Sequence, residues 1–290
     1  MKLIRYGKLN QEKTGMVIND VMYDTSAFGE DYNERFFETD GLKRLQQFVE
    51  SNKNKLEKIP EATRLGSPVA RPSKIVCIGL NYADHAKESG AQLPKEPIIF
   101  MKSTTSLIGP NDNIIIPKNS KKTDWEVELA VVIEKKASYI DEAEAINYVA
   151  GYCLHNDVSE REFQLERHGT WDKGKGCDTF APLGPWLVTK DEIKNVDDLN
   201  LWLTVNGHSM QNGTTADLIF RIPFLVSYIS QFMTLLPGDV ISTGTPAGVG
   251  LGMNPPVYLK AGDVVELGID GLGSAKQKVV TYPDIGSSLH

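Results

Sequence analysis

The sequence predicts a mixed, β-rich α+β fold in which a small N-terminal β/α domain precedes a larger domain. Many short β-like runs with Gly and Pro between them dominate the chain after residue 72. Helical periodicity is confined to a few stretches, so strands and helices do not alternate strictly. This argues against a doubly wound nucleotide-binding fold. A segment rich in Pro and small residues separates the two regions.

The N-terminal region reads as three short strands, namely Leu3–Tyr6, Met16–Ile18 and Val21–Tyr23. Asn19 and Asp20 are suited to a hairpin turn between the last two. A helix is expected from Gly41 to about Lys55, with Asp40 as its N-cap, because apolar residues recur on one face. The linker is expected between Pro60 and Pro72, which gives domains of residues 1–68 and 69–290.

In the larger domain the sequence predicts ten strands and three helical stretches. The strands are expected at Lys74–Ile78, Pro97–Met101, Asn113–Ile116, Val127–Ile133, Val149–Leu154, Trp186–Val188, Leu199–Val205, Asp239–Ser242, Val264–Ile269 and Lys276–Thr281. The helical stretches are expected at Asp141–Asn147, Ser159–Arg167 and Ile222–Thr234. The turn Asp270–Gly273 indicates a hairpin between the last two strands.

The composition is that of a soluble globular protein, with 41% hydrophobic and 24% charged residues. A formal charge of −7 without a Lys/Arg-rich face argues against nucleic-acid binding. The N-terminus lacks the apolar core of a signal peptide, and no stretch has the 18 or so uninterrupted apolar residues of a membrane span. Cys77, Cys153 and Cys177 are odd in number, which indicates reduced thiols. We therefore expect a cytoplasmic protein.

Glu126 and Glu128 stand two apart at the head of an apolar run, and Asp157 ends a second apolar stretch. Side chains at i and i+2 of a strand point to the same side, so the two glutamates can aim at one point. Converging carboxylates repel unless a cation lies between them. Oxygen ligands without His or Cys favour Mg²⁺, Mn²⁺ or Ca²⁺. The alternative is an acidic strand edge.

His85 and Glu88, in NYADHAKESG, are three apart, so one helical turn places them side by side. A carboxylate that bonds to an imidazole raises its basicity, which suits a general base acting on water. The alternative is a polar surface turn. The segment is short and bounded by Gly, so it is also a candidate for ordering on substrate binding.

Two further segments carry candidate binding groups. After Asp157, Arg161 and Gln164 share a helical face, and Lys175 lies in a Gly-rich turn where it could stabilise an oxyanion. An exposed loop lysine is the alternative, and the phosphate-loop pattern is missing. In PGDVISTGTPAGVG, the glycines and the hydroxyls of Thr243 and Thr245 suit a carboxylate or phosphate, or simply a tight turn. The sequence holds no G-x-S-x-G nucleophile elbow.

Together these runs resemble the fumarylacetoacetate hydrolase family over roughly residues 73–281. The resemblance rests on GLNYADH, DWEVELAVVI, HNDVSEREFQ, KGCDTFAPLGP, LPGDVISTGTPAGVG and LKAGDVVELGIDGLG. It implies a β-sandwich roll, a homodimer or higher homo-oligomer, and a Mg²⁺ or Mn²⁺ cofactor. By the same resemblance, the metal ligands are Glu126, Glu128 and Asp157, the water-activating dyad on a lid is His85 and Glu88, and the substrate and oxyanion contacts are Tyr82, Arg161, Gln164, Lys175 and Thr245.

The resemblance also implies a reaction: hydrolysis of the C3–C4 bond of an acylpyruvate, a small carboxylate substrate. Within the family, the length and the motifs most resemble bacterial sugar-acid hydrolases, which cleave 2,4-diketo-3-deoxy-rhamnonate or -fuconate to pyruvate and lactate. The resemblance therefore implies such a substrate, with a generic acylpyruvate close behind. Within the family, oxaloacetate decarboxylases, hydroxy-dienedioate isomerases and ureidoglycolate lyases are the alternatives. A catalytically silent member that only binds and oligomerises is the alternative outside enzymes.

Overall fold

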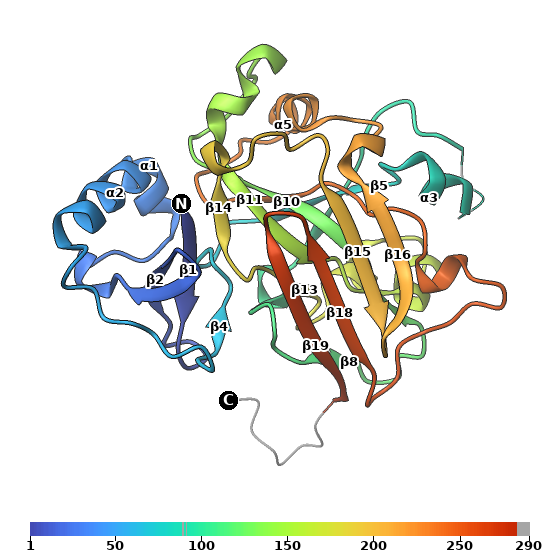
Figure 1. The fold of residues 1–290 in the computed structure, drawn as a ribbon. Helices are drawn as coiled ribbons and strands as arrows, with labels where there is room; N and C mark the ends of the chain where they lie inside the picture. The colour runs from blue at the N-terminus through green and yellow to red at the C-terminus, as the bar shows by residue number, and fades with distance from the viewer. Residues whose placement is uncertain (89, 91, 283–290) are drawn as a thin grey trace.

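The computed structural model describes residues 1–88, 90 and 92–282, and its centre is a ten-stranded mixed sheet (Figure 1). The strand order is β3-β2-β1-β14-β11-β10-β17-β5-β6, and β4 also pairs with β1. The bounds are β1 Lys2–Tyr6, β2 Lys13–Ile18, β3 Val21–Asp24, β4 Leu65–Gly66, β5 Ile75–Gly79, β6 Ile98–Lys102, β10 Val127–Ile133, β11 Val149–Asn156, β14 Leu187–Thr189 and β17 Val240–Ser242.

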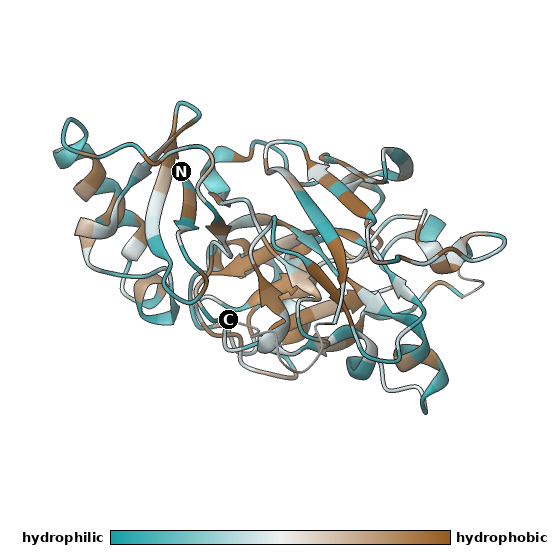
Figure 2. Ribbon diagram, turned by 90° about the horizontal axis from the view of Figure 1, so that it is seen from below, coloured by the Kyte–Doolittle hydropathy of each residue, from teal (hydrophilic) through white to brown (hydrophobic). Residues whose placement is uncertain are grey.

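A second, five-stranded sheet has the order β16-β15-β18-β19-β8. Its strands are β8 Ile114–Ile116, β15 Asn200–Val205, β16 His208–Thr214, β18 Val264–Ile269 and β19 Gly273–Thr281. Two-stranded pairs join β9 (Thr123–Asp124) to β12 (Ser159–Glu160), and β7 (Leu107–Ile108) to β13 (Ala181–Pro182). Figure 2 shows the apolar residues concentrated on the central strands, as expected for two sheets packed on a shared core. These features confirm the predicted mixed, β-rich fold class.

The helices lie at the periphery of the sheets (Figure 1). Along the chain they do not alternate regularly with the strands. They are α1 Glu34–Glu38, α2 Gly41–Asn52, α3 Ala83–Glu88, α4 Asp172–Lys175 and α5 Ile222–Ser230. Short 3₁₀ turns span Ser26–Phe28, Thr104–Ser106, Glu142–Tyr148, Lys190–Glu192, Thr215–Asp217 and Gly250–Gly252, and a π-helix spans Glu162–Glu166. No helix within the described part of the chain is long and apolar enough to cross a membrane.

The N-terminal strands continue the large sheet, because β1 pairs with β14 in the register Lys2↔Val188. The expected linker contains the short strand β4, which also pairs with β1. The predicted division at residue 68 therefore falls between segments that share one sheet. The predicted hairpin at Asn19 and Asp20 is confirmed, and both residues have positive φ, as the tight turn requires.

One local prediction was wrong, and two hold only in part. Helix α2 begins at Gly41 as expected, but Asp40 has φ of 54° and its side chain makes no capping hydrogen bond. The stretch expected to be helical from Ser159 begins as strand β12 and continues as the π-helix. The Gly-rich turn around Lys175 is the helical turn α4. Cys77 and Cys153 are buried, Cys177 is half-buried, and all three are free thiols as predicted.

Candidate metal and acid–base site

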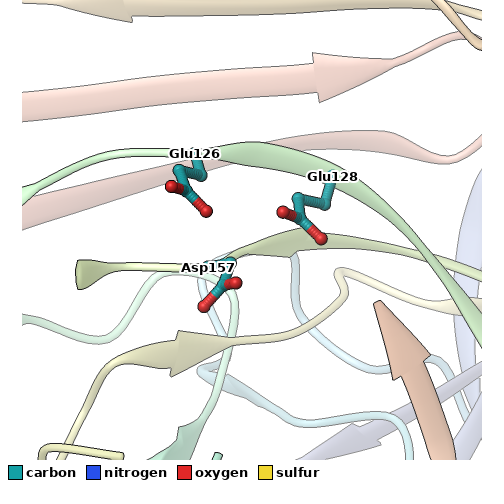
Figure 3. A group of neighbouring side chains, drawn as sticks. All are labelled: Glu126, Glu128 and Asp157. Atoms are coloured by element: carbon teal, nitrogen blue, oxygen red, sulfur yellow. The ribbon is translucent and has the colours of Figure 1, made fainter. Parts of the chain in front are cut away.

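Glu126, Glu128 and Asp157 offer carboxylate oxygens that all lie within 4.8 Å of one another. Figure 3 shows the three carboxylates turned toward a common point. The antiparallel register of β10 and β11 explains this, because Val127 faces Asn156 and places the next residue, Asp157, beside Glu126. The amide of Asp157 donates to the carbonyl of Glu126 at 2.9 Å. The convergence of three carboxylates predicted from the sequence is therefore confirmed.

Strand β10 is buried on both faces, and its alternation places Glu128 on the side away from the second sheet. Val127, Leu129 and Val131 belong to the core cluster that includes the second sheet, whereas Ala130 and Val132 pack into the other cluster. Glu128 shares the face of these two small side chains. It accepts hydrogen bonds from Ser242 Oγ and from the amide of Gly244 at 2.9 Å.

Three buried cations surround two of the carboxylates. Lys175 Nζ lies 2.6 Å from Glu126 Oε2 and 2.9 Å from Asp157 Oδ2. Lys102 Nζ lies 2.5 Å from Asp157 Oδ1. Arg161 Nη2 lies 2.7 Å from Glu126 Oε1, an ion-pair contact without hydrogen-bond alignment. Among the described residues Glu128 has no cation within ion-pair distance.

The electrostatics differ among the three carboxylates. Burial, together with Asp157 and Glu126, raises the pKa of Glu128 well above its usual range. Burial also raises the pKa of Glu126, but Lys175 and Arg161 outweigh it and hold that pKa below its usual value. For Lys175, burial lowers the pKa, but the negative charges of Asp157 and Glu126 outweigh burial and raise this pKa to about 12. Glu128 is therefore the carboxyl group of the cluster whose ionised form the neighbouring cations compensate least.

This donor set fits a divalent metal. All of the donors are carboxylate oxygens, and every one is buried, which favours a hard cation over zinc or copper. A cation beside Glu128 would offset the burial and the like charges that raise its pKa. The residues that would hold it are Glu126, Glu128 and Asp157.

His85 and Glu88 lie on helix α3, immediately beyond β5, and the structure brings them together as predicted. His85 Nδ1 lies 3.4 Å from Glu88 Oε2, a long contact. The amide of Gly248 donates to both oxygens of Glu88, at 3.0 and 3.1 Å. Gly248 has φ of 104°, a conformation that favours glycine, so the glycine-rich turn serves to fix Glu88.

A cavity of about 210 Å³ opens onto this group. The predicted site residues that line it are His85, Glu126, Glu128, Arg161, Gln164, Lys175 and Thr245. Asp157 and Glu88 are not part of this lining; each contacts a lining residue, Asp157 through Lys175 and Glu88 through His85. Tyr82 is fully buried, its hydroxyl has no partner within the described chain, and it is not part of the lining. Burial, with Glu128 adding to it, raises the pKa of Tyr82 above its usual range.

The two threonines of the glycine-rich segment bind backbone. Thr243 Oγ1 donates to the carbonyl of Leu129 and Thr245 Oγ1 to that of Val127, each at 2.9 Å. Thr245 also accepts from Gln211 Nε2 at 2.7 Å. A hydroxyl has one proton to donate. The two hydroxyls therefore hold strand β10 in place, and Thr245 faces the cavity without a proton free for a ligand.

Sequence reasoning missed Lys102 and Ser242, which contact Asp157 and Glu128. Lys102 ends the strand Ile98–Lys102 on the same face as Phe100, which lines the cavity. A lysine at the inward position of an apolar strand is a signal that could have identified it. Ser242 reaches Glu128 because β17 pairs with β10 in the register Ala130↔Ser242. That long-range register leaves no local signature.

Comparison with known proteins agrees with this geometry. The family model for the fumarylacetoacetate (FAA) hydrolase C-terminal region matches residues 74–280. A relative from Burkholderia multivorans, named no more specifically than a hydrolase, is 54% identical over 279 residues, which cover 96% of this chain and 98% of that protein.

Two solved structures share the fold. The maleylpyruvate hydrolase of Sphingobium sp. SYK-6, in complex with manganese(II) ion and pyruvate, has a TM-score of 0.81 and 30% identity, covering 98% of this chain and 100% of its own. The 2-hydroxyhepta-2,4-diene-1,7-dioate isomerase of Mycobacterium marinum has a TM-score of 0.75 and 32% identity, with coverages of 98% and 100%. With a family model over most of its length and these relatives, the chain belongs to the fumarylacetoacetate hydrolase family.

Proposed function

We propose that this protein is a metal-dependent hydrolase that cleaves the C3–C4 bond of an acylpyruvate. The observation that carries the proposal is the buried cluster of Glu126, Glu128 and Asp157 at a cavity that His85 also lines. A metal-binding centre and a base for water thus lie at one cavity. The Sphingobium relative, a hydrolase crystallised with manganese(II) and pyruvate, supports the same reaction class. Mg²⁺ and Mn²⁺ are the proposed cofactors.

In this mechanism His85 removes a proton from water, and the water oxygen attacks the C4 carbonyl carbon. Glu88 orients His85 and stabilises the imidazolium. As the C3–C4 bond breaks, its electron pair moves to the pyruvate fragment as an enolate, beside the ammonium of Lys175. His85 then returns the proton to C3, which completes pyruvate and the released acid. A divalent cation, when bound by the three carboxylates, supplies Lewis-acid stabilisation of the enolate oxygens.

Within this class the sequence motifs favour 2,4-diketo-3-deoxy-fuconate or -rhamnonate, which would give pyruvate and lactate. A generic acylpyruvate is the next candidate. We also propose that the protein acts as a homodimer.

Isomerisation of a hydroxy-dienedioate is the second candidate function. It is favoured by the Mycobacterium marinum isomerase, whose identity to this chain is similar to that of the Sphingobium hydrolase. Such an isomerisation, like oxaloacetate decarboxylation, would use the same metal and enolate without an attacking water. The requirement for a water-activating base at His85 therefore separates hydrolysis from both.

The deciding experiment is a screen of 2,4-diketo acids with Mg²⁺ or Mn²⁺ and enzymatic detection of pyruvate, run beside oxaloacetate and a hydroxy-dienedioate. Hydrolysis predicts one pyruvate and one acid released for each diketo acid consumed. Isomer formation, or pyruvate released from oxaloacetate alone, would contradict hydrolysis. His85→Ala should lower the rate of diketo-acid cleavage by about 10²- to 10⁴-fold with metal binding retained.

A further inference from the structure

The side chains that line the active-site cavity are of two kinds. One kind is polar and consists of the proposed metal ligands, the proposed base and their neighbours. The other kind is apolar and is contributed by Ile78, Leu80, Phe100, Leu165, Trp171 and Leu251. These apolar side chains come from five separate segments of the chain, and we call them the apolar wall of the cavity. Neither metal binding nor proton transfer by the base requires an apolar surface of this kind.

The cationic and hydroxyl side chains of the lining already have partners within the protein, although Nη2 of Arg161 makes only an ion-pair contact and no hydrogen bond. Arg161 donates from Nε to Asp124 at 2.8 Å and from Nη1 to Gln164 Oε1 at 3.1 Å, besides its contact with Glu126. Lys175 lies against two carboxylates, and Thr245 donates to backbone. Across the lining that the structure describes, Arg161 and Lys175 are the cations, and both are paired. A second carboxylate on a substrate would find no unpaired cation there.

The apolar wall is firmly packed at its aromatic part. Trp171 lies against Gly79 so closely that a Cβ there would be 2.5 Å from Trp171 Cζ3. Its ring meets that of Phe100 edge-on, with centroids 5.3 Å apart. Phe100 in turn lies under Lys175, whose Nζ is 5.0 Å from the ring centroid. The wall therefore begins directly beside the ammonium group. Leu165 is at the mouth and is 45% exposed.

We propose that this wall selects an uncharged acyl group with an apolar end and rejects acylpyruvates that carry a second carboxylate. The inference rests on the proposed acylpyruvate hydrolysis. An apolar chain gains by leaving water for this wall, whereas a carboxylate placed there loses hydration with no cation to replace it. A deoxy sugar acid with a terminal methyl group fits this requirement, and a dioate does not.

The test compares two matched pairs of acids that differ only at the far end. Calorimetry in the presence of Mn²⁺ measures the binding of 2-oxoheptanoate and 2-oxoheptanedioate, which lack the 4-oxo group and cannot be cleaved. Pyruvate release measures turnover of 2,4-dioxoheptanoate and 2,4-dioxoheptanedioate. The expected result is at least about tenfold tighter binding, and at least about tenfold higher kcat/KM, for the acid with the apolar end.

Leu165→Arg places a cation at the mouth of the wall, with Leu165→Gln as the matched neutral control. The affinity for 2-oxoheptanedioate relative to 2-oxoheptanoate should be at least about tenfold higher in the arginine variant than in the glutamine variant. Equal or tighter binding of the dioate by the wild type overturns the inference, as does a preference that Leu165→Arg leaves unchanged. If 2-oxoheptanoate binds with the expected preference but neither dioxo acid releases pyruvate, the wall is confirmed and the proposed hydrolysis fails.

Discussion

Lys175 Nζ lies 2.6 Å from Glu126 Oε2, and both side chains are buried. The same ammonium also contacts Asp157, so it shares oxygens with two of the three proposed metal ligands. Helix α4 brings it there, since the amide of Lys175 bonds to the carbonyl of Trp171 at 3.1 Å. The cationic group proposed to stabilise the enolate and the proposed metal ligands are thus one electrostatic unit.

Replacing Lys175 should separate catalysis from metal binding. Lys175→Met removes the charge beside the enolate, so kcat should fall by about 10²- to 10³-fold. Mn²⁺ affinity should stay the same or rise, because the two carboxylates lose a competing cation. Steady-state kinetics and calorimetry check this, with Lys173→Met, an exposed lysine on the same helix, as the control. Loss of Mn²⁺ binding in Lys175→Met would contradict the account.

Lys102 should prove essential to stability. Its buried ammonium bonds to Asp157 Oδ1 and to the carbonyl of Val158 at 3.0 Å. Lys102→Met leaves Asp157 with less compensation, so the free energy of unfolding should fall by about 3–5 kcal/mol. Mn²⁺ should restore part of this loss by binding the native state. Urea unfolding with EDTA or Mn²⁺ measures both effects, and Lys122→Met, at an exposed pair, should change stability by under about 1 kcal/mol.

The His85–Glu88 pair should affect turnover and spare the metal site. Removal of a general base costs about 10²- to 10⁴-fold in rate, so His85→Ala should lower kcat by that range, and Glu88→Gln should lower it less. The three carboxylates are untouched, so Mn²⁺ affinity should match that of the wild type. Rapid-quench kinetics measures turnover, and calorimetry measures the Mn²⁺ affinity. Full activity of His85→Ala would exclude it as the base.

Gly79 should control the position of Trp171. A methyl group at residue 79 would lie 2.5 Å from the rigid indole, which must then move. Gly79→Ala should therefore shift the tryptophan emission and lower kcat/KM by roughly tenfold or more. Trp171→Phe in the same chain should recover part of the loss, because the smaller ring makes room. If kcat/KM falls further in the double variant than the two single substitutions together predict, the two residues do not compete for this space.

The sequence predicted the site better where its residues are close in the chain. Glu126 and Glu128 were identifiable because strand alternation is local, and Asp157 because it ends an apolar stretch. Lys102 and Ser242 were not, since their contacts depend on how β6 and β17 lie beside the central strands. The polar edge strand His208–Thr214 was missed because its exposed residues lack apolar alternation. The π-helix at Glu162–Glu166 has no distinctive local pattern.

The most direct test of the central claim is calorimetric titration of Mn²⁺ into the metal-free wild type and into Glu128→Gln. Among the described residues, Glu128 is the proposed ligand with no cation within ion-pair distance. The substitution keeps its size and its bonds from Ser242 and Gly244 near to native. Glu166→Gln, at an exposed carboxylate, is the control. The account predicts one Mn²⁺ site in the wild type and the control, and an affinity at least about 100-fold lower in Glu128→Gln. Unchanged affinity in Glu128→Gln would contradict the three-carboxylate metal centre.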